Sequence, residues 1–302
     1  MRNIVLFILW SYIVCGKLVT DEHSTGPPGA KLRYDLLSNS EPGIEYPEDH
    51  LGAFVPVLRR DGSGGNFPVP EFDPWACQQD NLTNTITITA QWEDDRVSTG
   101  RLNTYGVWST ALAEDIKMHG YLEVESTLPA KQDGDNFRSS WPGIWLLGPG
   151  NGAGWPNYGE IDIACAYDGY PQIFMELHST NHHSGAAQRP PGSPIDLEAD
   201  LSVDPITAGL EWEISEKEGN IKLTWWIKWF DQASETWTNL NTTKSLFGEG
   251  NDDYFIFLNS FLSEGFSLII DLPEGGSLFP GPVLPGHQPQ YMEIFNVKVF
   301  GF

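Results

Sequence analysis

The stretch Trp155-Pro-Asn-Tyr-Gly-Glu160-Ile-Asp162-Ile-Ala-Cys165-Ala-Tyr-Asp168 holds two carboxylates that are two positions apart. Alternate side chains of a β-strand project from the same face, so we expect Glu160 and Asp162 to lie side by side, with Ile161 and Ile163 turned to a core. Neighbouring acids repel each other, which raises the pKa of one and suits a proton donor or a poised nucleophile. Ordinary surface acids on a solvated strand would show the same spacing.

Aromatic residues around these acids favour a binding site over a solvated strand. Trp155 opens the stretch, and Trp141-Pro-Gly-Ile-Trp145-Leu-Leu-Gly lies just upstream. Flat indole rings can stack on the apolar faces of sugar rings, although each tryptophan could instead belong to the core.

The stretch resembles the active strand of glycoside hydrolase family 16, in its laminarinase-like branch of endo-β-1,3-glucanases and β-1,3-glucan recognition proteins. The family pattern is Trp-Pro-x-x-Gly-Glu-Ile-Asp-Ile-x-Glu. The resemblance implies that Glu160 is the nucleophile of a retaining glycosidase and that Asp162 assists it. The last glutamate of the pattern is the acid/base, and Cys165 stands in its place.

A thiol is a poor substitute for that acid, because its pKa is near 8.5 and it is a weak hydrogen-bond donor. A rescue acid could be Glu176, which shares a strand face with His178, or Asp168, which should lie beyond the strand end. Cys165 itself could pair with Cys77 or point into the core. The family needs a β-bulge to bring this position back to the cleft.

The resemblance also implies substrate-binding roles for six residues: Arg101, Asn103, Trp141, Trp145, Trp155 and His178. Asp271 stands where the family has asparagine. The family often holds a structural calcium through an aspartate of its closing strand, but Phe295 stands there, so we expect no cofactor. His182 and His183 have metal-like spacing with His178, yet their surroundings read as an exposed loop, and we expect no metal.

Alternating segments predict an all-β fold. Expected strands lie at 84–90, 120–129, 173–178, 223–230, 255–258, 266–276 and 292–300. The leading threonine-rich segment should turn Ile86 and Ile88 to the core. At least one of Trp225, Trp226 and Trp229 should also be core. Because no helices are expected between these strands, we predict a two-sheet antiparallel β-sandwich, a concanavalin-like jelly roll with a concave glycan cleft.

Composition limits the partners of the 302-residue chain. Its net charge is −24, so nucleic acid and anionic membranes are poor partners. Residues 1–16 read as a secretory signal peptide, with a retained anchor as the alternative. Residues 17–71 read as a Pro/Gly-rich acidic leader that is loosely ordered or packed on the domain, and residues 72–302 as the jelly-roll domain. We expect a secreted monomer.

Three functions remain open from the sequence. The chain could hydrolyse β-1,3-glucan or mixed-linkage glucan with a substitute or missing proton donor. It could be a catalytically impaired protein that recognises β-glucan. It could be an extracellular structural protein that reuses the sandwich.

Overall fold

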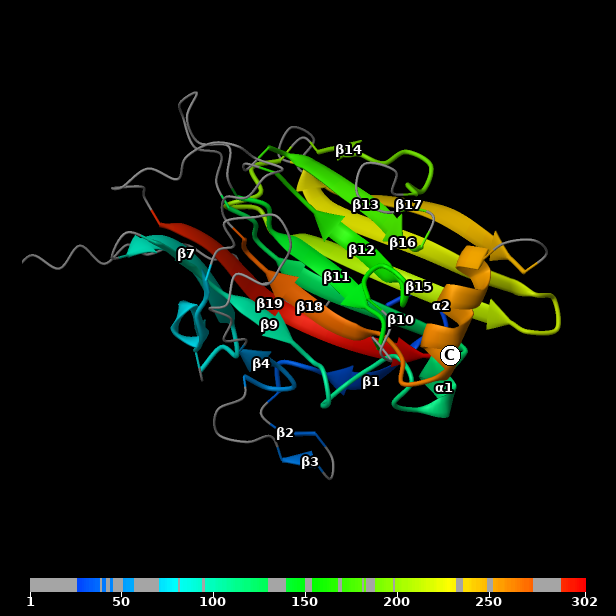
Figure 1. The fold of residues 1–302 in the computed structure, drawn as a ribbon. Coiled ribbons are helices and arrows are strands. Elements are labelled where there is room, and N and C mark those ends of the chain that lie inside the picture. The colour runs from blue at the N-terminus through cyan, green and yellow to red at the C-terminus, as the bar shows by residue number, and fades with distance from the viewer. Residues whose placement is uncertain are drawn as a thin grey trace, which may run out of the picture.

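Two β-sheets stack face to face in the computed structural model (Figure 1). The structure describes residues 26–38, 40–41, 44–45, 51–56, 71–80, 82–93, 96–129, 140–149, 154–167, 170–180, 182, 188–197, 199–231, 236–248, 252–273 and 289–302. The pairing is antiparallel in both sheets apart from one short parallel pair, β5 with β8. The predicted two-sheet sandwich is therefore confirmed.

The first sheet has seven strands and faces the viewer in Figure 1. Its order is β14 (Ile195–Asp196), β13 (Gln172–His178), β12 (Glu160–Cys165), β11 (Gly143–Leu147), β18 (Ser267–Asp271), β9 (Arg101–Asn103) and β4 (Val55–Pro56). β12, which carries Glu160 and Asp162, is thus an interior strand with a neighbour on each side.

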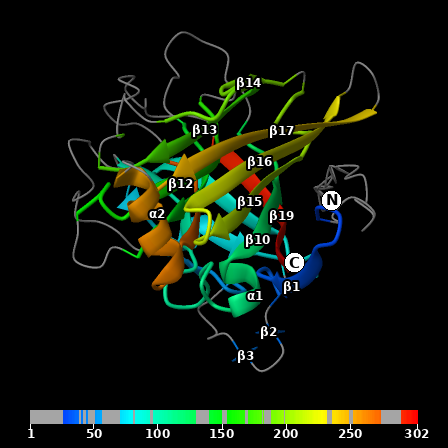
Figure 2. The same cartoon turned by 90° about the vertical axis from the view of Figure 1, so that its right-hand side faces the viewer.

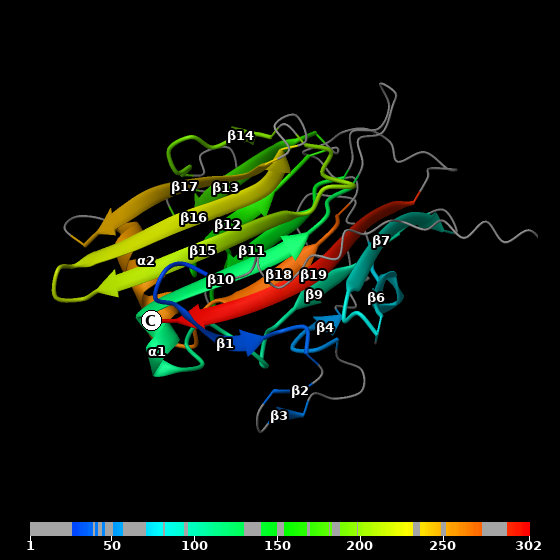
Figure 3. The ribbon, with the colours of Figure 1, turned by 180° about the vertical axis from the view of Figure 1, so that it is seen from behind.

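The second sheet has ten strands and is seen from behind in Figure 3. Its main path is β17 (Thr236–Phe247), β16 (Asn220–Asp231), β15 (Ile206–Ser215), β10 (His119–Ser126), β19 (Gln290–Gly301), β7 (Ile86–Glu93), β8 (Arg96–Thr99) and β5 (Glu71–Phe72). β1 (Lys31–Asp35) pairs with β19, and β6 (Cys77–Gln79) pairs with β7.

The core lies between the sheets and follows from the alternation of apolar residues. Ile161 and Ile163 of β12 are fully buried there, as are Ile86 and Ile88 of β7, as the sequence predicted. Trp225 of β16 is also fully buried, and its Nε1 donates to the backbone oxygen of Asp162 at 2.8 Å. This bond ties the second sheet to the peptide that carries the acid.

One expected strand is a helix. The sequence predicted a strand at 255–258, but α2 (Asp252–Leu262) covers it (Figure 2). Tyr254, Phe257 and Phe261 are buried, and their spacing of three and four residues places them on one face of a helix. The prediction considered only the four apolar residues 255–258, and so did not include the buried residues on either side, Tyr254 and Phe261, which reveal the helical spacing. Within the described residues, the further helical segments are α1 (Glu114–Lys117) and a 3-10 turn, η2 (Pro74–Ala76).

Segments ahead of Phe72 take part in the sandwich. β1 and β4 extend the two sheets, and Leu36, Leu37 and Phe54 are buried in the core. β2 (Ser40–Glu41) and β3 (Ile44–Glu45) form a separate pair. β1, β4 and the buried Leu36, Leu37 and Phe54 are thus part of the sandwich, whereas the expected signal peptide lies outside the described residues. Among the helices of the described chain, none combines the length and apolarity that crossing a membrane requires.

Candidate active site

A β-bulge in β12 decides which side chains share the outer face of the seven-stranded sheet, called here the site face. Ile144 of β11 is opposite Ala164, but the next residue, Trp145, is opposite Asp162. Ile163 is therefore the extra residue, and both it and Ala164 are buried in the core. Cys165 consequently returns to the face that carries Glu160 and Asp162.

Cys165 is a free, half-buried thiol, and Cys77 is also free. Neither the disulfide nor the core position considered from the sequence is present. Burial raises the pKa of the Cys165 thiol well above its usual value, and the charges of Asp162 and Asp271 raise it further. The thiol therefore stays protonated at neutral pH, without the acidity of a carboxylic acid.

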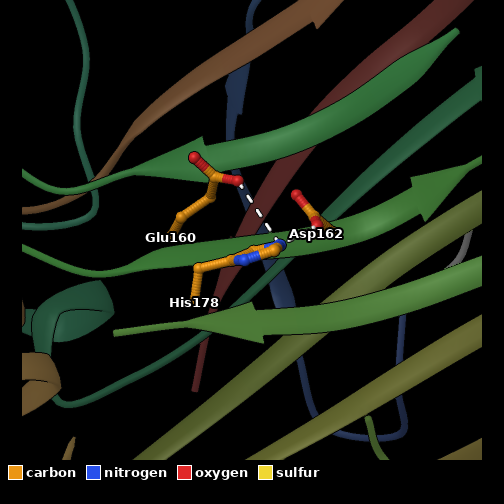
Figure 4. A group of neighbouring side chains, drawn as sticks. All are labelled: Glu160, Asp162 and His178. Carbon is orange, nitrogen blue, oxygen red and sulfur yellow. Dashed lines mark hydrogen bonds and ion pairs between the residues drawn. The ribbon is translucent and has the colours of Figure 1, made fainter. Parts of the chain in front are cut away.

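Three carboxylates converge on one imidazole beside this thiol. β13 places His178 opposite Glu160 and Glu176 opposite Asp162. His178 Nε2 lies 3.0 Å from Asp162 Oδ2, 3.5 Å from Glu176 Oε2 and 3.7 Å from Glu160 Oε1. Figure 4 shows the side chains of Glu160, Asp162 and His178 turned toward one another.

The protonation of this cluster follows from crowding and burial. Burial opposes a charge on His178, but hydrogen bonds to Asp162 and Glu176 outweigh it and raise the pKa of the ring to about 10. The ring is therefore an imidazolium at neutral pH. Burial, and then the charge of Asp162, raises the pKa of Glu160, and burial likewise raises that of Asp162. Glu160, Asp162 and Glu176 together would carry more negative charge than the one imidazolium of His178 can neutralise.

Glu176, the residue considered as a rescue acid, does lie in the cluster. Arg189 holds it, with Nε 2.7 Å and Nη2 2.6 Å from Glu176 Oε1. Burial alone would raise the pKa of Glu176, but hydrogen bonds to His178 and Arg189 lower it overall. Glu176 is therefore ionised in the range where a general acid must hold its proton. Asp168, the other acid considered, lies outside the described residues.

The site face also carries an ion pair, which is separated from Cys165 by Gly143 of β11. Cys165, Gly143 and Asp271 lie in one row across β12, β11 and β18, and Arg101 of β9 continues the row. Arg101 Nε is 2.8 Å from Asp271 Oδ2, and Trp145 Nε1 donates to Asp271 Oδ1 at 3.2 Å. Sequence reasoning found Arg101 and Trp145 but missed that Asp271 joins them, although its charge in an otherwise apolar strand was a signal.

Phe72 completes this second group and was not foreseen. The Arg101 guanidinium carbon lies 4.0 Å from the centre of the Phe72 ring and 5.4 Å from that of Trp145. Asn103, the other polar residue expected here, accepts a hydrogen bond on Oδ1 from the backbone N–H of Tyr105. Its side chain is therefore used in shaping the turn that follows β9.

The three tryptophans expected to bind substrate differ in how far their rings are exposed to solvent. Trp155 is 44% exposed, its Nε1 donates to Glu160 Oε2 at 2.9 Å, and its ring centre lies 5.8 Å from that of His178. Trp145 is half-buried on the site face, and Trp141 is half-buried just before β11. Trp155 therefore offers the most open aromatic surface beside the acids.

Glu160, Asp162 and His178 also offer donor atoms that lie within 4.8 Å of one another, close enough for a metal ion. The His178 ring, protonated on both nitrogens, already carries a positive charge beside these carboxylates. Of the other two histidines considered as ligands, His182 pairs through Nδ1 with Asp253 Oδ2 at 2.8 Å, and His183 lies outside the described residues.

Solved structures share this architecture along nearly the whole chain. Superposition on a laminarinase from Flavobacterium sp. UMI-01 gives a TM-score of 0.61 at 20% identity and covers 89% of this chain and 100% of that one. The chain has the laminarinase fold. An endo-1,3-beta-glucanase from Streptomyces sioyaensis gives a TM-score of 0.63 at 17% identity, covering 91% of this chain and 97% of that one.

A third structure of the laminarinase fold carries a bound sugar. It is a family GH16 endo-beta-1,3(4)-glucanase, SCLam, in a mutant co-crystallized with 1,3-beta-D-cellotriosyl-glucose. It gives a TM-score of 0.63 at 18% identity and covers 91% of this chain and 96% of that one. The sequence itself matches no protein-family model and no curated protein sequence.

Proposed function

We propose that this chain binds β-1,3-glucan or mixed-linkage glucan across the site face and hydrolyses it feebly or not at all. The observation that carries the proposal is the β12 bulge, which turns Cys165 to the same face as Glu160 and Asp162. The expectation that the chain is secreted, drawn from residues 1–16, fits a glucan met outside the cell. The solved glucanases of the same fold support the class of ligand.

Retaining hydrolysis needs one carboxylate to attack and a second carboxyl group to protonate the leaving oxygen. Glu160 and Asp162 supply the attacking side. Of the described groups around them, Cys165 is a weak acid and Glu176 is held ionised by Arg189. Asp271 is a third candidate, but both of its oxygens accept hydrogen bonds, from Arg101 and Trp145. Loss of general acid catalysis costs about 10²–10⁴-fold in rate. Binding does not need that proton.

The site face keeps the features that sugar binding requires. Trp155 presents an open indole ring, and polar and charged side chains lie beside it. Stacking and hydrogen bonding to sugar hydroxyls both remain possible without a proton donor. These features favour glucan binding over a purely structural role.

The test is reducing-end release from laminarin by the purified chain and by Cys165→Glu, with Cys165→Ser as the matched control that adds no carboxyl group. We expect the native chain and Cys165→Ser to retain laminarin in a pull-down while releasing little product. Cys165→Glu should release at least about 100-fold more. The double variant Cys165→Glu with Glu160→Gln should be silent.

Efficient release by the native chain would overturn the proposal in favour of an enzyme. Glu176→Gln would then show whether Glu176 is the donor. A native chain that neither retains laminarin nor releases product would favour the structural alternative.

A further inference from the structure

A hollow lies between α2 and the turn that precedes β12. Its volume is about 520 Å³, and its lining includes Pro149, Asn157, Tyr158, Ile256, Asn259 and Ser263. Figure 2 shows α2 at one end of the stacked sheets. The helix contacts β16 and β17, and its Ser260 bonds the turn before β12. This hollow, called here the α2 pocket, has a volume within the range of small-molecule sites.

The lining of the α2 pocket carries no charge among the residues described. It combines apolar surface from Pro149, Ile256 and Tyr158 with amide and hydroxyl groups from Asn157, Asn259 and Ser263. This is unusual in a chain with 41 acidic residues and a net charge of −24. Amides and hydroxyls both donate and accept hydrogen bonds, so the lining suits a neutral ligand with many hydroxyl groups.

The turn and the helix hold each other in place. Ser260 Oγ donates to the backbone oxygen of Tyr158 at 2.6 Å, and Thr180 Oγ1 donates to Asn157 Oδ1 at 2.9 Å. Gly159 has positive φ, and a Cβ there would lie 3.3 Å from the Phe257 ring and 3.5 Å from Ile256. The pocket wall is therefore built by packed groups and is present before any ligand binds.

The α2 pocket adjoins the acids. Tyr158 lies two residues before Glu160, and Trp155, which hydrogen-bonds Glu160, begins the same turn. Burial raises the pKa of Tyr158, and the charge of Glu160 raises it further, as expected for neighbouring groups. One wall of the pocket and the acid Glu160 therefore belong to one continuous segment, residues 155–160.

We propose that the α2 pocket binds additional neutral sugar units of the same glucan chain that lies against Glu160. The inference rests on the proposed function and deepens it, since it makes recognition depend on the length of the glucan. Stacking on Tyr158 and hydrogen bonds to Asn259 and Asn157 would supply the added affinity.

The experiment is titration calorimetry of the full chain with laminaritriose and laminarihexaose. Asn259→Lys fills the pocket with a charged chain, and Phe255→Lys is its matched control, because Phe255 is exposed on the same helix without lining the pocket. We expect Asn259→Lys to weaken laminarihexaose binding about tenfold, the equivalent of one or two hydrogen bonds. Laminaritriose binding and the Phe255→Lys variant should stay as in the native chain.

Tyr158→Phe is a milder variant that keeps the ring and removes only the hydroxyl. It should weaken laminarihexaose binding about threefold and leave laminaritriose unchanged. If Asn259→Lys binds both sugars as the native chain does, or weakens both equally, the pocket proposal is wrong. A native chain that binds neither sugar would instead overturn the proposed function.

Discussion

Two charged groups share the site face and are balanced in opposite ways. On β12 and β13, three carboxylates surround the single imidazolium of His178. On β18 and β9, the one carboxylate of Asp271 meets the one guanidinium of Arg101. The first group has an excess of negative charge, and the pKa values of Glu160 and Asp162 are raised in it. Burial raises the pKa of Asp271 as well, but Arg101 opposes that rise and makes the second group neutral as a pair. We therefore expect pH to act mainly on the first group and the second group to hold the shape of the site.

The largest effect should come from breaking the balanced pair. Asp271→Ala leaves the mostly buried Arg101 without its carboxylate and Trp145 without its acceptor. We expect a loss of about 3 kcal/mol in the free energy of unfolding, measured by urea denaturation. Asp271→Asn keeps one acceptor oxygen, for either Arg101 or Trp145, and should cost about half as much. A loss below about 1 kcal/mol for Asp271→Ala would show that the pair does not hold the shape of the site.

The unbalanced group should make stability depend on pH. A raised pKa in the folded chain gives stability that is complete below the unfolded pKa and is lost as the pH rises through the folded value. The unfolded pKa of His178 is near 6.5 and its folded value is about 10, and that of Glu160 rises in the same direction. The free energy of unfolding should therefore fall between pH 6.5 and 10 through His178, and between pH 4.5 and 8 through Glu160.

His178→Gln removes the imidazolium and should flatten that fall by on the order of 2 kcal/mol, read from urea titrations at pH 6 and pH 9. His119→Gln is the control, since His119 contacts the acid Glu211 away from the site. Equal slopes in the native chain and in His178→Gln would contradict the description of this group.

A smaller effect should follow from the indole above the acids. Trp155→Phe keeps an aromatic face but removes the N–H that reaches Glu160, and we expect laminarin affinity to fall about threefold. Trp155→Ala removes the face as well and should cost about tenfold. If both variants bind as tightly as the native chain, Trp155 takes no part in recognition.

The smallest effect should come from Arg189, whose side chain is 48% exposed. Arg189→Ala removes a partner that holds Glu176 ionised, so the pKa of Glu176 should rise, measurable by carbon-detected NMR titration. The free energy of unfolding should change by less than about 1 kcal/mol, because exposed ion pairs contribute little. An unchanged pKa for Glu176 would mean that His178 alone controls it.

The sandwich could be predicted from the sequence because every second residue of a half-buried strand faces the core and is apolar. Ile86 and Ile88, and likewise Ile161 and Ile163, show this period and are buried as expected. The helix α2 was missed because its buried residues, Tyr254, Phe257 and Phe261, are spread over eight positions, whereas the expected strand was inferred from four consecutive residues. Local alternation therefore identifies strands well and fails where a longer period competes with it.

The site was harder to predict because its contacts join distant residues. Glu160 and Asp162 could be placed on one face from their spacing, but a bulge breaks the alternation and brings Cys165 to the same side. The pairing of Arg101 with Asp271 spans 170 positions and depends on the neighbouring strands β9 and β18. Strand order, which fixes such pairs, is set by the whole fold rather than by any single segment.

The position of β19 has a consequence for the order in which the protein can assemble. This strand is made from residues 290–301, yet it lies between β10 and β7 in the middle path of the ten-stranded sheet and also pairs with β1. β10 can pair with β15, and β7 with β6 and β8, before β19 has been made. The edges of β1, β7 and β10 that face β19 must stay unpaired until almost the whole chain has been made. A chain cut short by a dozen residues would lose the strand that joins the early segments to the later ones.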